Sequence, residues 1–165
     1  MKFHLFILAI SILSFIACDS DSSNGPNTNN TTPEPTVIDW EENPQSCTVR
    51  ANKDSVFLDF TFQKWDLNIV TITDGRNVLS IQKFTGIDES FFYDFCNSIG
   101  QALNQQVNQT LESASVTCNK NVMVEEYTMA ASLPTISVAE YANTMSKMCQ
   151  QLLNGEISMK GNFIP

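Results

Sequence analysis

The chain has 165 residues, with 9 basic and 18 acidic side chains and a formal net charge of −9 at pH 7. This acidic balance argues against nucleic-acid binding and against electrostatic docking on anionic lipid. The sole histidine, His4, lies in an apolar leader. Without that leader the chain has no imidazole for Ser-His-Asp or Cys-His hydrolysis, for zinc ligation or for acid–base catalysis.

The first 17 residues are typical of a secretory signal peptide. Lys2 supplies the positive charge, and residues 3–17 form an apolar stretch that is too short for a spanning helix. The run Phe15-Ile16-Ala17-Cys18 resembles the lipobox of bacterial lipoproteins. The resemblance implies that Cys18 carries a lipid and anchors the protein in the bacterial cell envelope, at the inner membrane, the outer membrane or the cell surface. The alternative is an ordinary signal peptide in which this cysteine occurs by chance.

Two further segments follow the leader. Residues 18–36 contain the cysteine and then only Ser, Asn, Thr, Asp, Gly, Pro and one Glu, which cannot bury enough apolar surface to offset the entropy of ordering. We therefore expect a disordered tether there. Residues 37–165 are long enough to form one domain with a core of its own.

The first half of this domain has strand patterns and then a helix pattern. Apolar residues alternate over residues 56–62, and the segment 67–73 is rich in β-branched residues, so both segments are predicted strands. Asp74-Gly75-Arg76-Asn77 is typical of a hairpin turn that leads to a third strand over 78–84. Asp88 can cap a helix, in which apolar residues then recur four apart and Gly100 is the weakest position.

The second half repeats this order. Strands are expected at about 110–118 and 121–129, and Ser137 with Glu140 forms the capping box of a second helix. Gly155 suits the end of that helix, and residues 157–163 are consistent with a last edge strand. Short connections favour antiparallel pairing, so the expected fold is α+β: an antiparallel sheet of about five to six strands with both helices packed on one face.

The cysteines fit a domain that is oxidised outside the cytoplasm. Apart from Cys18 there are four of them, an even number suited to two disulfides. The order strands, helix, strands, helix also suggests a loose internal duplication with one disulfide in each unit. The favoured pairing is therefore Cys47–Cys96 with Cys118–Cys149, and its nearest rival is Cys96–Cys149 with Cys47–Cys118.

Cofactor and metal chemistry find no support in the sequence. The four cysteines do not form the close pairs that a zinc site needs, there is no glycine-rich phosphate loop, and Arg76 opposes a calcium ion at the hairpin turn. We expect no cofactor and no metal. Carboxylates remain as catalytic candidates, but the adjacent pair Glu125 and Glu126 should point to opposite faces of a strand. A small carboxylate-dependent glycan hydrolase or lyase is therefore the alternative function.

The favoured function is a non-catalytic, lipid-anchored module that binds a protein or a glycan. Phe57, Asp59 and Thr61 share the strand face opposite the expected core, and Trp65 follows that strand. Together they form the candidate binding surface, because aromatic rings can stack on sugars or anchor a partner protein. The competing interpretation is that Phe57 makes only a cross-strand pair and Trp65 closes one end of the core.

Overall fold

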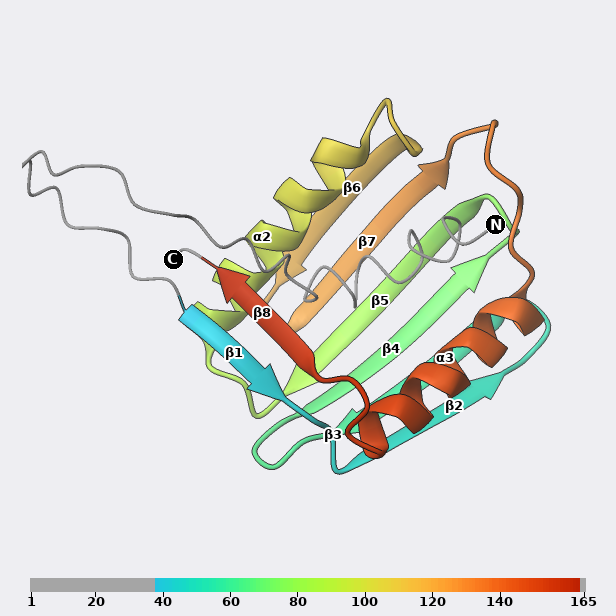
Figure 1. Ribbon diagram of the computed structural model, residues 1–165. Coiled ribbons are helices and arrows are strands. Elements are labelled where there is room, and N and C mark those ends of the chain that lie inside the picture. The colour runs from blue at the N-terminus through green and yellow to red at the C-terminus, as the bar shows by residue number, and fades with distance from the viewer. Residues whose placement is uncertain (1–37, 164–165) are drawn as a thin grey trace, which may run out of the picture.

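The computed structural model describes residues 38–163, and its main feature is an antiparallel sheet with two helices on one side (Figure 1). This confirms the predicted α+β class. The six strands lie in the order β2-β3-β4-β5-β7-β6. In chain order, their bounds are β2 (Ser46–Ala51), β3 (Ser55–Thr61), β4 (Asp66–Thr73), β5 (Asn77–Thr85), β6 (Leu111–Asn119) and β7 (Val122–Met129).

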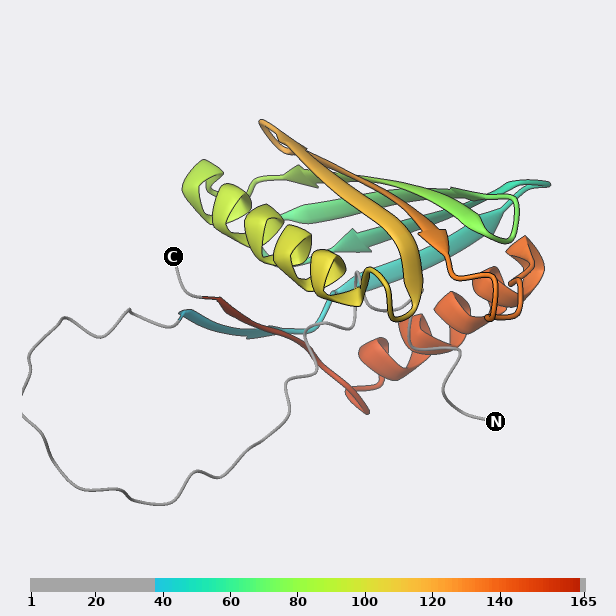
Figure 2. The ribbon, with the colours of Figure 1, turned by 90° about the horizontal axis from the view of Figure 1, so that it is seen from above.

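The remaining elements all lie on the same side of this sheet, as Figure 2 shows. They are the helices α2 (Glu89–Gln106) and α3 (Val138–Leu153) and a two-stranded ribbon of β1 (Ile38–Glu42) with β8 (Met159–Phe163). We call the side that they cover the helix side and the other side the open face. Helix α3 packs along β2 and β3, and α2 packs along β6, so the two helices lie over opposite edges of the sheet.

Strand alternation explains which residues form the core. Along β4 and β5 every second side chain is buried on the helix side, as period-two alternation requires. The core joins these side chains to the apolar stripes of both helices, and it includes Phe92, Cys96 and Ile99 of α2 and Tyr141, Met145 and Cys149 of α3.

The helices begin where the sequence predicts. The Asp88 side chain accepts hydrogen bonds from the backbone N–H groups of Ser90 and Phe91, which have no partner within the helix. Ser137 and Glu140 form the predicted capping box of α3. Helix α2 runs through Gly100 without a break, and a Cβ at that position would meet only ordinary contacts with Val116.

Both disulfides exist, but the predicted pairing is wrong. The bonds are Cys47–Cys149 and Cys96–Cys118, with Cα–Cα distances of 5.4 and 6.1 Å. Each bond ties a helix to the edge strand beneath it, α3 to β2 and α2 to β6. Because Cys47 and Cys149 come from the two halves of the chain, the disulfides do not follow the suggested duplication.

The sheet also contains connections that the sequence pattern did not indicate. After β5 the chain crosses through α2 to the far edge, forms β6, and returns with β7 between β5 and β6. Strands β1 and β2 were not predicted. Strand β2 pairs with β3 at the edge, and β1 pairs with β8, with Ile38 opposite Phe163.

Gly86 and Gly155 provide a matched pair of substitutions, because both have a left-handed φ, of +84° and +70°. A Cβ at Gly86 would lie 2.6 Å from the Lys64 carbonyl oxygen, whereas a Cβ at Gly155 would have nothing within 4 Å. We expect Gly155→Ala to lower the free energy of unfolding by about 1 kcal/mol, from backbone strain alone. Gly86→Ala should cost about 3 kcal/mol, because the steric overlap adds to that strain. Urea unfolding would measure both, and equal losses would contradict the close approach at Gly86.

Candidate functional site

The open face carries a band of apolar side chains that crosses four strands. Phe57 pairs with Val70, Val70 with Ile81 and Ile81 with Val124, so the four side chains stand side by side on β3, β4, β5 and β7. We call them the apolar row. All four are half-buried, and the neighbouring Ile72 is 38% exposed. Among the described elements none lies over this face (Figure 2).

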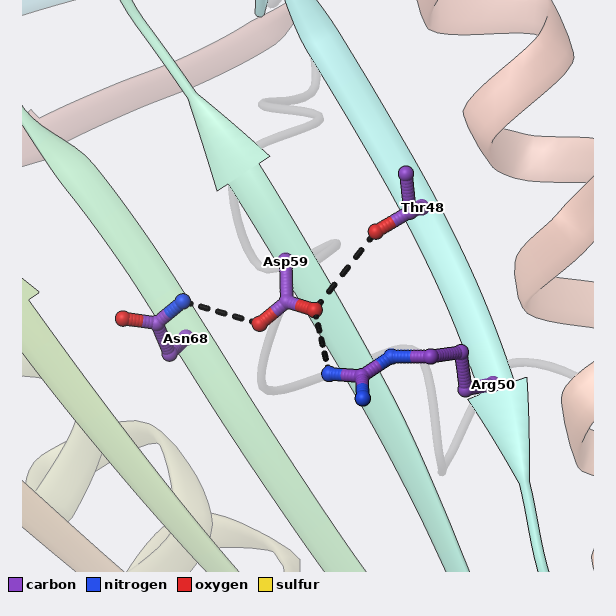
Figure 3. A network of polar contacts seen from close by, with 4 residues as sticks. All are labelled: Thr48, Arg50, Asp59 and Asn68. Carbon is purple, nitrogen blue, oxygen red and sulfur yellow. Dashed lines mark hydrogen bonds and ion pairs between the residues drawn. The ribbon is translucent and has the colours of Figure 1, made fainter.

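A polar network centred on Asp59 (Figure 3) lies next to the apolar row, two residues along β3 and β4 from Phe57 and Val70. The Asp59 carboxylate accepts hydrogen bonds from Arg50 Nη2 at 2.8 Å and from Asn68 Nδ2 at 2.8 Å, and a longer one from Thr48 Oγ1 at 3.5 Å. Partial burial raises the pKa of Asp59, but the hydrogen bonds and the charge of Arg50 outweigh it and bring the pKa below its ordinary value. The Arg50 guanidinium also lies 5.6 Å from the centre of the Phe57 ring.

This network should contribute little to stability. Arg50 is 68% exposed and Asp59 35% exposed, so water screens their ion pair. We expect a double-mutant cycle of Arg50→Ala and Asp59→Ala to give a coupling energy below about 1 kcal/mol, measured by urea unfolding. The coupling should fall further in 1 M salt. A coupling above 2 kcal/mol would show that the network is a structural element of the fold rather than a feature of its surface.

A hollow of about 350 Å³ borders the other side of the apolar row. Ile72, Leu79, Glu126 and Thr128 line it together with Asp74 of the β4–β5 turn. The Asp74 carboxylate accepts hydrogen bonds from the side chain and backbone N–H of Asn77 and from the backbone N–H of Arg76, which together lower its pKa to about 2. Asp74 therefore stabilises the turn, and Glu126 is the other exposed carboxylate that lines the hollow.

The predicted binding surface is divided between the two sides of the molecule. Phe57 and Asp59 lie on the open face, and Thr61 is exposed at the end of β3. Trp65 packs against the core instead, with its ring centre 3.9 Å from that of Phe62 and its Nε1 donating to Glu42 Oε2 at 2.9 Å. About 13 Å of strand separates Phe57 from the end of β3 at Thr61, and Trp65 lies beyond that end. The structure therefore does not bring Phe57 and Trp65 together, and Trp65 closes one end of the core.

The helix side holds a second group of polar residues, of which only Glu125 was a candidate from the sequence. Thr71, Ser80, Gln82 and Glu125 are all buried on the central strands, and we call them the polar floor. Gln82 Nε2 donates to Glu125 Oε1 at 2.7 Å. In the sequence, each of these residues is polar at a position where the strand alternation calls for an apolar side chain. As expected for strand neighbours, Glu125 is buried on this side while Glu126 is exposed on the other.

The described residues contain no group of three or more His, Cys, Asp or Glu side chains that could hold a metal ion. Within residues 38–163, no helix has the length and apolar character needed to cross a membrane. No protein-family model, curated protein or solved structure matches the chain.

Proposed function

We propose that the protein is a lipid-anchored, non-catalytic binding module of the bacterial cell envelope, and that its open face binds a partner protein. The observation that carries the proposal is the apolar row, which spans four strands on a face without a described covering element. Apolar patches with a polar border are typical of protein-interaction sites. The Asp59 network and the hollow supply that border on the two sides.

The anchor part of the proposal rests on Cys18 and the residues before it, which lie outside the described part of the chain. In a bacterial host we expect the protein to partition into the detergent phase of a Triton X-114 extract and to incorporate a fatty-acid probe. Cys18→Ser should abolish the labelling. A wild-type protein that stays in the aqueous phase without a label would contradict lipidation.

Crosslinking tests the binding surface in the cell. A photoreactive residue at Ile81, in the centre of the apolar row, should yield one discrete adduct with an envelope protein in the native host. The same residue at the exposed Gln105 of α2 is the matched control and should yield none. Replacing Val70 and Val124 by Asp should remove the adduct at Ile81 without loss of the circular dichroism spectrum. Equal adducts at both positions, or none at Ile81, would exclude this face as the site.

The alternative is a carboxylate-dependent glycan hydrolase or lyase, because Asp74 and Glu126 both line the hollow. A general acid needs a raised pKa at neutral pH. The pKa of Asp74 is about 2, so Asp74 does not suit that role. Release of reducing ends from a cell-wall polysaccharide by the purified domain, lost in Glu126→Gln, would replace the binding proposal with the enzymatic one.

A further inference from the structure

A second row of side chains crosses the open face beside the apolar row, and it changes from apolar to acidic along its length. Ile72 of β4 pairs with Leu79 of β5, and Leu79 pairs with Glu126 of β7. We call these three residues the hollow row, because all of them line the hollow of about 350 Å³. Each lies two positions along its strand from a member of the apolar row, so the two rows are about 7 Å apart.

Glu126 is the member of the hollow row that can bind a ligand through charge. Its side chain is exposed, and within residues 38–163 it makes no hydrogen bond or ion pair. The ion pair of this face, Arg50–Asp59, lies on the other side of the apolar row. Both oxygens of the Glu126 carboxylate are therefore available to a donor that approaches along Ile72 and Leu79.

The rim of the hollow holds a second negative charge in a fixed position. Thr128 Oγ1 donates to Asn77 Oδ1 at 3.0 Å, and Asn77 Nδ2 donates to Asp74 Oδ2 at 2.8 Å. The pKa of Asp74, about 2, keeps its carboxylate ionised at neutral pH. The side chain of Arg76 on the same turn is engaged at the end of β7, where its Nη1 donates to the Ala130 carbonyl at 3.1 Å. The hollow thus combines an apolar wall with two carboxylates.

We propose that the hollow receives an arginine side chain of the partner protein that binds to the apolar row. This inference rests on the proposed function and specifies the chemistry of the partner. The aliphatic stem of the arginine would lie on Ile72 and Leu79, and its guanidinium would donate two parallel hydrogen bonds to Glu126. Arginine suits this position better than lysine, because its planar fork matches a carboxylate and is less strongly hydrated. Arginine is also among the residues enriched at the centres of protein interfaces.

The distance between the two rows defines the segment that the partner would present. Residues i and i+2 of an extended chain lie on the same face about 7 Å apart, which equals the separation of the rows. A segment with an apolar residue at i and an arginine at i+2 would therefore contact both rows at once. The hollow is near the lower end of the range of small-ligand pockets, about 300–1,000 Å³, so its size suits one long side chain.

Charge reversal in the full chain, in the native host, tests the arginine contact. With the photoreactive residue at Ile81, Glu126→Arg should reduce the adduct at least tenfold, because the arginine of the partner would meet a like charge. Glu126→Gln should reduce it at least threefold. Glu89→Arg is the matched control, since it makes the same change at an exposed glutamate of α2 on the helix side, and it should leave the adduct unchanged.

The outcomes separate this inference from the proposed function. An adduct at Ile81 that persists in both Glu126 variants would overturn the arginine contact and leave the binding face in place. Equal losses in Glu126→Arg and Glu89→Arg would also overturn it, because net charge alone would then explain the effect. If the chain without these substitutions gives no adduct at Ile81, both the inference and the proposed function are wrong.

The identity of the contacted residue can be read from a second crosslink. A photoreactive residue at Ser113, which is exposed and lines the hollow, should link to a segment of the partner that contains an arginine, as mass spectrometry of the digested adduct would show. Replacing that arginine by glutamate should weaken the Ile81 adduct at least tenfold, and Glu126→Arg should then restore it. A linked segment without an arginine, or a charge exchange that restores nothing, would contradict the proposal.

Discussion

Removal of the Cys47–Cys149 disulfide by the double substitution Cys47→Ala/Cys149→Ala is expected to lower the free energy of unfolding by about 4.7 kcal/mol. The reason is the length of the closed loop, because the two cysteines are 102 residues apart. The bond thereby restricts most of the domain in the unfolded state. Urea unfolding of the oxidised protein and of the variant at pH 7 would measure the loss.

The other disulfide is the natural control. Its cysteines are 22 residues apart, so Cys96→Ala/Cys118→Ala should cost about 3.4 kcal/mol by the same relation. Each pair joins one buried helical cysteine to one partly buried strand cysteine, which makes the local packing losses comparable. The expected difference is then about 1.3 kcal/mol. A larger loss from the shorter loop would contradict a contribution dominated by chain entropy.

Phe84→Ala should be among the most damaging single substitutions in the core, with a loss of about 3–5 kcal/mol. Phe84 is 2% exposed, and its ring centre lies 5.4 Å from that of Phe92 and 5.5 Å from that of Phe95. On its other side the Trp65 ring stacks at 6.2 Å. The substitution therefore leaves a cavity where β5, α2 and the β3–β4 turn meet, and thermal or urea unfolding would measure its cost.

Phe57→Ala provides the comparison for the same chemical change. Phe57 is half-buried on the open face, where water can fill the space that its ring leaves. We expect a loss below about 1.5 kcal/mol, since the substitution creates no closed cavity. Similar losses at the two positions would mean that the open face is covered in solution, as it would be in a stable dimer.

Local signals account for the parts of the fold that the sequence predicted. Strands β3, β4 and β5 follow from alternation and β-branched residues, and the turn at Asp74 follows from the hydrogen bonds that its side chain accepts from nearby backbone N–H groups. The two helix starts follow from capping residues. Each of these signals acts within a few residues, so one sequence suffices to detect it.

Long-range pairing accounts for most of what the sequence did not predict. Whether Cys149 meets Cys47 depends on α3 returning to the far edge of the sheet, and no local pattern encodes that return. Strand β2 is an exposed edge with weak alternation. Trp65 lies beyond the end of β3, where alternation no longer tells on which side a ring packs. The polar floor was detectable in principle, because Ser80 and Gln82 occupy buried positions of a strand pattern.

The pairing of β1 with β8 determines how the domain would respond to mechanical load. Ile38 lies opposite Phe163, so the two ends of the described chain leave from the same end of one antiparallel ribbon. With the proposed lipid anchor at Cys18, tension between the membrane and a load on the C-terminus would open this ribbon one residue pair at a time. The force would then reach the Cys47–Cys149 bond, which carries it directly from β2 to α3. Only the residues before Cys47 and after Cys149 would lengthen, and the sheet between them would remain folded under load.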